Sequence, residues 1–234
     1  MLEKSLIVKI GHFFKPARTI PRTSWTAHGR WDLGFRRVAI LIFGLLVFGF
    51  GDACLINSHI GNAPWSVLAQ GIHVQTGIPI GVGTFAISTV VLMLWWPLRE
   101  KPGFGTLMNI LFIAIAIQIG VDYFPNLHSN LLLQILYCFL GVGLVGIGSS
   151  LYITCGLGPG PRDGLMTALH HRTGIRVGRV RLCIEIVAFL IGWALGGTVG
   201  IGTAIFALFI GNSVAINLNL IVKLSNRLGR DHLS

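Results

Sequence analysis

Two short polar segments stand out in a chain that is otherwise strongly apolar. Each segment opens with glycine and proline, at Gly61–Pro64 and at Gly158–Pro161. Their polar side chains are the residues predicted to line a solute pathway: Asn62, Ser66, Gln70, His73, Arg162, Asp163, Thr167 and His170. If each segment is helical, these side chains form a polar stripe on it, and the free N–H groups at the helix start attract an anion. The predicted chemistry is therefore the binding of a small polar or anionic solute.

An ion pair between Arg181 and Glu185 is the second candidate. The two residues are four positions apart, so they share one face of a helix. Charges are costly in hydrocarbon, and pairing neutralises both of them. The pair either sets the depth of the helix or takes part in coupling or gating, with Glu185 as a proton-binding or cation-binding carboxylate.

The two histidines of the polar segments occupy equivalent positions. Histidine titrates near neutral pH, so His73 and His170 are either proton carriers or interfacial residues with satisfied hydrogen bonds. His170 and His171 have no companion ligands at metal spacing, so neither a metal site nor a cofactor is predicted. No clustered nucleophile and base can be named, and the chain is not expected to be an enzyme.

The composition is typical of a membrane protein. Hydrophobic residues make up 53% of the chain and charged residues 11%, and the mean hydropathy is +0.75. The net charge of +10 does not indicate a nucleic-acid partner, because the basic residues gather in the N-terminal segment and between apolar runs. Membrane lipids are the expected surroundings.

Six apolar runs are long enough to cross a bilayer, which takes about 20 helical residues. The expected spans are 38–57, 80–97, 105–124, 131–153, 180–197 and 200–220. The predicted organisation is a basic segment (1–37), a first membrane unit (38–124), a second (131–220) and a basic tail (221–234).

The two membrane units are repeats of one another. Residues 44–119 align with 141–216 without a gap, at an offset of 97 positions. Because each unit has three spans, the second must start from the opposite face of the membrane. The predicted fold is therefore all-α, with six transmembrane helices in two inverted three-span repeats, each with a short half-helix that begins at Gly-Pro.

The placement of lysine and arginine predicts the orientation. These residues occur in the N-terminal segment, after the second and fourth spans and in the tail, whereas the gaps around 58–79, 125–130 and 198–199 have none. Since basic residues stay on the cytoplasmic side, both termini are expected to be cytoplasmic.

The half-helices have two interpretations. As re-entrant elements they dip into the bilayer and line a pathway, because irregular backbone survives there only when it is buried or faces a cavity. As interfacial connectors they lie at the membrane surface, with Trp65 at headgroup level and Arg172 facing water.

Several strings resemble a known family. They are GNAPWSVLAQGI (61–72), WWPLREKPGFGTLMN (95–109), CGLGPGPRDGLMTAL (155–169), TGIRVGRVRLCIEI (173–186) and GWALGGTVGIGTAIFALFIG (192–211). They are similar to the YczE/YitT-type bacterial integral membrane proteins over about residues 38–220. The resemblance implies a multi-pass protein of the bacterial inner membrane, with no assigned activity and no catalytic set to transfer.

The expected function is that of a small secondary transporter or permease. Inverted halves are the arrangement from which alternating access is commonly built, although this argument is one of fold analogy. The alternative is a non-transporting membrane partner or regulator, whose basic N-terminus docks another protein or anionic lipid. The small size of the bundle makes a homodimer plausible.

Overall fold

Apolar runs separated by Gly and Pro fold into helices throughout the described part of the chain. The computed structural model describes residues 21–127 and 130–230, which form helices and connecting loops without a strand. The helices are α2 (Phe35–Asn57), α3 (Pro64–Thr76), α4 (Ile80–Met93), α5 (Trp95–Leu98), α6 (Phe104–Tyr123), α7 (Leu131–Thr154), α8 (Pro161–Thr173), α9 (Val177–Ala194) and α10 (Ile201–Arg230).

Five helical stretches of the described residues are long and apolar enough to cross a membrane. They are Phe35–Asn57, Ile80–Leu98, Phe104–Tyr123, Leu131–Thr154 and Ile201–Ser225. The predicted all-α, multi-span class is therefore confirmed. The expected span at 180–197 corresponds to α9, which has 18 residues and includes Arg179, Arg181 and Glu185. Because of these three charged residues, α9 is not among the five helical stretches that are apolar enough to cross a membrane.

Two helices extend into the basic segments expected at the ends of the chain. Helix α10 runs on to Arg230, so the expected tail at 221–234 is helical for its first ten residues. The helix continues because Ile221 and Ser225 are buried, and the Ser225 hydroxyl accepts a hydrogen bond from the Ser24 N–H at 2.8 Å. Helix α2 begins at Phe35, so the last three residues of the expected N-terminal segment, 1–37, are helical. Residues 1–20 of that segment lie outside the described part of the chain.

The helices repeat at the spacing of the sequence repeat. The half-helices α3 and α8 start at the equivalent prolines Pro64 and Pro161 and end at Thr76 and Thr173. Proline suits the first helical position because its missing N–H has no partner there in any case. Both helices end on a glycine with positive φ, Gly77 at 73° and Gly174 at 69°, the left-handed cap that glycine adopts without strain.

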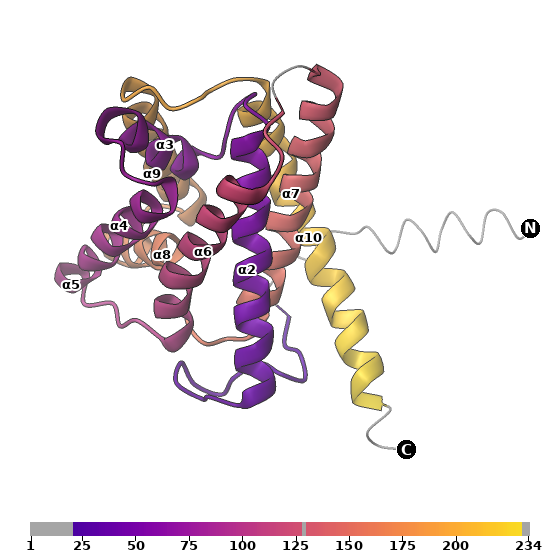
Figure 1. Ribbon diagram of the computed structural model, residues 1–234. Helices are drawn as coiled ribbons and strands as arrows, with labels where there is room; N and C mark the ends of the chain where they lie inside the picture. Colours follow the sequence, from indigo (N-terminus) through magenta and orange to yellow (C-terminus); the bar gives the residue numbers. More distant parts are fainter. Residues whose placement is uncertain (1–20, 128–129, 231–234) are drawn as a thin grey trace, which may run out of the picture.

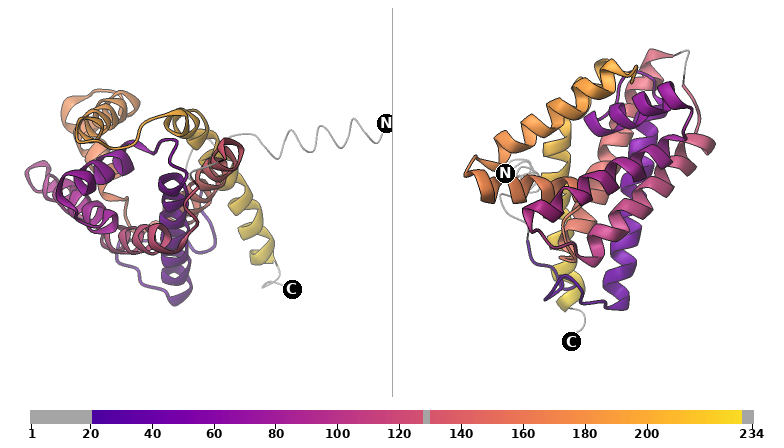
Figure 2. Two further views of the ribbon diagram at one scale, coloured as in Figure 1. Left: turned by 45° about the horizontal axis from the view of Figure 1, so that its top comes forward. Right: turned by 90° about the vertical axis from the view of Figure 1, so that its left-hand side faces the viewer.

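Four long helices form a continuous row, in the order α6, α2, α7 and α10, with each packed against the next. In Figure 1, α2 and α7 stand side by side, α10 lies beyond α7, and the shorter helices α3, α4, α5, α8 and α9 gather on the other side of the bundle. The left-hand view of Figure 2 shows the same separation between the row and the shorter helices, and in its right-hand view the shorter helices lie in front of the row. The half-helices therefore face the row across the interior.

Helices α2 and α7 cross through glycines at reciprocal positions. A Cβ on Gly44 would lie 3.1 Å from the Gly148 carbonyl oxygen, and one on Gly51 would lie 2.8 Å from the Gly141 carbonyl oxygen. The two helices are thus antiparallel and in backbone contact. Gly44 is equivalent to Gly141 and Gly51 to Gly148, so each glycine packs against the counterpart of the other. Equivalent glycines of the two repeats thus make matching contacts at the crossing of α2 and α7.

Equivalent hydrogen bonds join the two halves at both ends. The Gly202 N–H at the start of α10 donates to the Ile60 carbonyl at 2.8 Å, before α3. The Gly105 N–H at the start of α6 donates to the Leu157 carbonyl at 2.8 Å, before α8. The loop that leads into each half-helix is therefore fixed by the other repeat.

Residues 21–34, here called the strap, cover the N-terminal end of α2. Trp25 is 5% exposed and donates from its ring N–H to the Thr154 hydroxyl of α7 at 3.3 Å. Arg37 donates to the Trp25 carbonyl at 2.6 Å and pairs with Asp32 at 2.7 Å. The His28 N–H and the Arg37 guanidinium lower the pKa of Asp32 below its usual value by hydrogen bonding to its carboxylate. The strap therefore ties the ends of α2 and α7 together.

We expect Asn57→Ala to destabilise the bundle by about 1–3 kcal/mol, because it removes a buried amide that closes the end of α6. Asn57 is 1% exposed and shares its N–H groups among the carbonyls of Gly120, Val121 and Phe124 at 3.4, 3.3 and 3.1 Å. Thermal unfolding in detergent measures the loss. Asn126→Ala, at an exposed position that contacts His59, is the control. Equal effects of the two substitutions would contradict the assignment.

Candidate functional site

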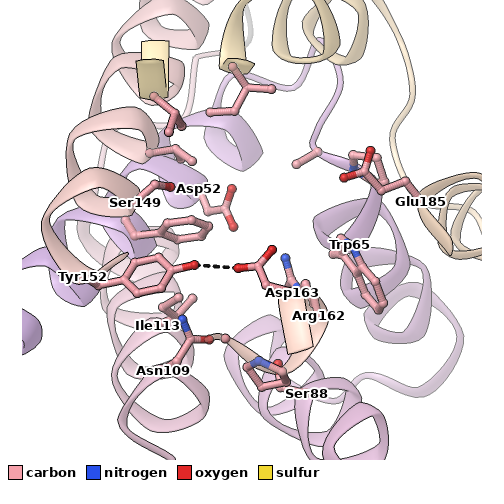
Figure 3. A pocket seen from close by; sticks show the side chains of 18 of the residues that line it. Asp52, Trp65, Ser88, Asn109, Ile113, Ser149, Tyr152, Arg162, Asp163 and Glu185 are labelled. Atoms are coloured by element: carbon pink, nitrogen blue, oxygen red, sulfur yellow. Dashed lines mark hydrogen bonds between the residues drawn. The ribbon is translucent and has the colours of Figure 1, made fainter. Parts of the chain in front are cut away.

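A cavity with charged and polar side chains in its wall lies between the row of long helices and the two half-helices. Its volume is about 170 Å³. Polar or charged side chains from six helices line it: Asp52, Ser88, Asn109, Ser149, Tyr152, Arg162, Asp163, Arg181 and Glu185. Figure 3 shows Asp52, Arg162 and Asp163 directed toward the same space. A polar interior within apolar helices is a candidate site for a solute.

The cavity sits where the two repeats meet. Equivalent positions line it from both sides, such as Pro64 with Pro161 and Ser88 with Glu185. Trp65 and Arg162 are also equivalent, and they touch each other: the guanidinium carbon lies 4.8 Å from the centre of the indole ring. The two repeats contribute unequally to the charge of the wall, because the second repeat supplies Arg162, Asp163, Arg181 and Glu185 and the first supplies Asp52.

Arg162 lies at the start of α8 with its charge uncompensated by a close carboxylate. Among the described residues, its guanidinium makes no hydrogen bond or ion pair, and its contact is the face of Trp65. Gly160, the residue that caps α8, offers no side chain to the first-turn N–H groups. The arginine and the helix start together present donors to the cavity.

Asp52 is the most buried charged residue that lines the cavity. It is 2% exposed, and its Oδ1 atom has no hydrogen-bond partner among the described residues. Ser66 approaches the carboxyl group from α3, and Arg162 acts on it electrostatically from a greater distance. A buried carboxylate that lacks a close partner is costly, so this position favours a ligand that can supply one.

Asp163 and Glu185 differ from Asp52 because each has a close partner. The Tyr152 hydroxyl donates to Asp163 Oδ2 at 2.8 Å, the contact drawn in Figure 3. The Arg181 Nε donates to Glu185 Oε1 at 2.8 Å, so the i,i+4 pair predicted from the sequence is present. This pair forms part of the wall of the cavity.

We expect Tyr152→Phe to cost about 1.5–3 kcal/mol of stability, since it removes a hydrogen bond to a carboxylate and leaves Asp163 without that donor. Unfolding in detergent, followed by circular dichroism, measures the change. Tyr123→Phe, at an 82% exposed position at the end of α6, serves as the control. If the two variants unfold alike, the hydroxyl does not support the cavity wall.

The other predicted pathway residues do not line this cavity. Asn62 donates to Gln70 Oε1 at 2.7 Å, and that oxygen also accepts from the Thr198 N–H at 2.9 Å, in a cluster beside the start of α10. The Asn62 Oδ1 atom is buried without a partner. The Thr167 hydroxyl donates to the Asp163 carbonyl at 2.8 Å within α8. These three side chains support the half-helices.

The two histidines bind backbone at the ends of the half-helices. The His73 Nδ1 atom is 2.8 Å from the Ile78 carbonyl oxygen, and the His170 Nδ1 atom is 2.6 Å from the Ile175 carbonyl oxygen. This equivalent geometry fits satisfied residues at helix ends. Within the described range, no three His, Cys, Asp or Glu side chains gather to hold a metal ion.

Sequence reasoning missed several residues of the cavity. Asp52, Ser88, Asn109, Ser149 and Tyr152 are polar residues within apolar spans, and none of them was among the predicted pathway residues. Comparison of the two repeats could have identified some of these residues. Asp52 is equivalent to Ser149 and Ser88 to Glu185, so both copies carry polar residues where a lipid-facing helix would not.

The fold and the site together define a multi-pass membrane protein with a polar interior. Residues 35–219 match a family described as a family of unknown function, DUF6198, and the chain belongs to that family.

The relatives have similar lengths but no assigned activity. The chain is 42% identical over 210 residues to an uncharacterized protein of Haemophilus influenzae. The aligned region covers 90% of this chain and 96% of that protein. The chain is 30% identical over 198 residues to the uncharacterized membrane protein YczE of Bacillus subtilis. This aligned region covers 84% of this chain and 89% of YczE. The expected resemblance to the YczE-type family is thereby confirmed. No solved structure matches the chain.

Proposed function

We propose that the protein is a small secondary transporter or permease for a small polar or acidic solute. In this proposal, α9 is the sixth span, the two repeats are inverted in the membrane, and both termini are cytoplasmic. The solute binds in the central cavity. The membrane is the bacterial inner membrane, as the resemblance to YczE-type proteins implies.

The crossing of α2 and α7 supports the inverted arrangement. Two antiparallel spans with reciprocal glycine contacts are related by an axis perpendicular to them, and such an axis lies in the plane of the membrane. The placement of arginine and lysine supports the same topology, because every predicted outer gap lacks them.

A sixth span at α9 is supported by its packing and by its ion pair. Gly192 in α9 lies directly against the backbone of α3, since its Cβ would be 2.5 Å from the Leu68 nitrogen. Arg181 and Glu185 neutralise each other, which lowers the cost of placing this helix in hydrocarbon. Eighteen residues span about 27 Å, close to the thickness of the hydrocarbon core.

An unequal packing of the repeats supports alternating access. A Cβ on Gly81 of α4 would lie 2.5 Å from the Ala114 carbonyl oxygen, so α4 is closed against α6. The equivalent residues are Gly178 of α9 and Gly211 of α10, and a Cβ on either would have nothing within 4 Å. Under the proposed topology, the outer contact is closed and the inner contact is open. If α4 opens from α6 and α9 closes on α10, the cavity becomes open to the outer side and closed to the inner side.

The observation that carries the proposal is a pair of opposite charges on the wall of one cavity, the buried Asp52 and the partly buried Arg162, neither of which forms a salt bridge among the described residues. Arg162 and Asp52 line the same space without forming an ion pair with each other. A lipid-embedded bundle gains no stability from such charges, whereas a solute-binding site requires them.

Uptake into proteoliposomes tests the proposal. The solutes are labelled acetate, propionate, glycine, β-alanine and methylammonium, and the variants are Arg162→Met and Arg172→Gln. We expect the wild type to take up at least one solute that has an acidic group. Arg162→Met should reduce that uptake about 100-fold, which corresponds to ~2.7 kcal/mol. Arg172 is exposed at the end of α8, so its substitution should have little effect. Unchanged uptake in Arg162→Met would contradict the proposal.

The strap favours a second candidate, a non-transporting partner of another protein or of anionic lipid. Trp25 anchors residues 21–34 to α7, and the sequence that precedes this strap is basic, with Lys4, Lys9, Lys15 and Arg18. Deletion of residues 1–20 distinguishes the candidates. A permease should retain uptake after the deletion, whereas a docking protein should lose its function while Asp163→Asn and Glu185→Gln retain it.

A further inference from the structure

We propose that the solute is a small zwitterion, whose acidic group binds Arg162 and whose basic group binds Asp52. This inference rests on the proposed function, because it names the class of solute that the same cavity takes. It differs from that function in requiring two opposite charges on one solute molecule.

Arg162 provides the site for the acidic group. Its guanidinium has five N–H donors, and none of them is used by a hydrogen bond within the described residues. Trp65 supports the flat face of the group at 4.8 Å, which leaves the edges for a carboxylate. The start of α8 adds its positive dipole at the same place.

Asp52 provides the site for the basic group. It is 2% exposed, its Oδ1 atom is unpartnered, and no arginine or lysine nitrogen of the described residues lies within 4.0 Å of it. Figure 3 shows its carboxylate directed into the cavity. An ammonium group of the solute would supply both the missing hydrogen bond and the missing charge.

The other two carboxylates on the wall each have a hydrogen-bond partner. Asp163 accepts from the neutral Tyr152 hydroxyl at 2.8 Å, and Glu185 forms an ion pair with Arg181 at 2.8 Å. Asp52 is therefore the carboxylate whose buried oxygen a solute can complete, and Arg162 is the guanidinium of the wall that makes no hydrogen bond among the described residues. A purely anionic solute would leave Asp52 unpartnered, and a purely cationic solute would leave Arg162 unpartnered.

The volume of the cavity limits the size of the solute. A cavity of about 150 Å³ holds one benzene molecule. The present cavity, at about 170 Å³, therefore suits a solute of similar size, such as a small amino acid.

Binding to the purified full-length protein in detergent tests the inference without requiring transport. The probes form matched sets: glycine, β-alanine and γ-aminobutyrate; acetate, propionate and butyrate; and methylammonium, ethylammonium and propylammonium. Trp65 lies against Arg162, so quenching of its fluorescence reports binding. Trp65→Phe shows which part of the signal comes from Trp65, because the chain has 6 tryptophans.

We expect at least one zwitterion to bind about 10-fold or more tightly than its matched anion and its matched cation, since one charged hydrogen bond contributes about 1.5–3 kcal/mol. Asp52→Asn should remove this advantage by weakening the binding of the zwitterion, because the ammonium group loses its carboxylate partner. Equal or tighter binding of the anion by the wild type would overturn the inference, and so would the absence of binding by any zwitterion. The comparison in the wild type decides the matter even if Asp52→Asn does not fold.

The two proposals fail in different ways. Binding and uptake of the anions alone would refute the zwitterion and leave the permease intact. Selective binding of a zwitterion without uptake would leave this inference intact and refute the permease.

Discussion

Gly148→Leu is expected to abolish the folded protein, because it separates the two helices at the centre of the bundle. A Cβ at Gly148 would lie 2.5 Å from the Gly44 carbonyl oxygen and 2.5 Å from the Phe48 nitrogen. These are backbone atoms, which cannot rotate away as a side chain can. Overpacking typically costs about 1–3 kcal/mol even where side chains adjust. The cost here should exceed that range, which is large against a total stability of about 5–15 kcal/mol.

Gly143→Leu on the same helix is the matched control. A Cβ at Gly143 meets nothing within 4 Å, so this substitution adds equal bulk without a clash. Membrane yield and size-exclusion profile in detergent measure both variants. Gly143→Leu should give a monodisperse protein and Gly148→Leu should aggregate. A well-folded Gly148→Leu variant would show that α2 and α7 do not cross at this glycine.

The second large effect is expected from a disulfide between Gly178→Cys and Gly211→Cys. In the present structure neither position has a neighbouring atom within 4 Å of its Cβ, so neither is packed against another helix. The equivalent pair, Gly81 and Ala114, is in contact. If the repeats exchange their arrangements, α9 closes on α10 and brings the two cysteines together. Oxidation should then trap the closed state and abolish uptake, and reduction should restore it.

A second cysteine pair controls for random collision. Gly178→Cys combined with Gly143→Cys places cysteines at two open positions that the exchange of arrangements does not bring together. Gel mobility after mild oxidation measures disulfide formation, and uptake of labelled β-alanine or propionate measures function. An oxidised Gly178–Gly211 pair that retains full uptake would contradict the proposed movement. Equal cross-linking of both pairs would do the same.

The sequence predicted the helices well because the repeat specifies them twice. Proline at Pro64 and Pro161 and glycine at Gly77 and Gly174 define the start and end of each half-helix locally, so no tertiary information was needed. Helix α10 extends beyond the span expected at 200–220. Its last turns are held by contacts with the strap, such as that of Ser225 with Ser24, and these contacts join residues 201 positions apart.

The charged part of the site was predicted from residue type, but the cavity itself was not. Arg162, Asp163, Arg181 and Glu185 stand out because charge is rare in apolar surroundings. Ser88, Ser149 and Tyr152 are unremarkable in sequence, and their role depends on which face of a span points inward. The polar stripe of α3 predicted Gln70 and His73 as pathway residues, but these positions bind Asn62 and the Ile78 carbonyl instead. Helical periodicity identifies a polar face and does not identify its neighbour.

The measurement that tests the central claim most directly is the labelling of Ser149→Cys with an impermeant thiol reagent, applied from each side of the membrane. Ser149 lines the cavity, and the four native cysteines, including the exposed Cys183, are replaced by alanine. Thr76→Cys and Thr173→Cys, exposed equivalent positions at the ends of α3 and α8, report the two faces.

Alternating access predicts that Ser149→Cys reacts from both sides, whereas Thr76→Cys reacts only from outside and Thr173→Cys only from inside. Labelling of Ser149→Cys from one side alone, or of both threonine positions from the same side, would contradict the account.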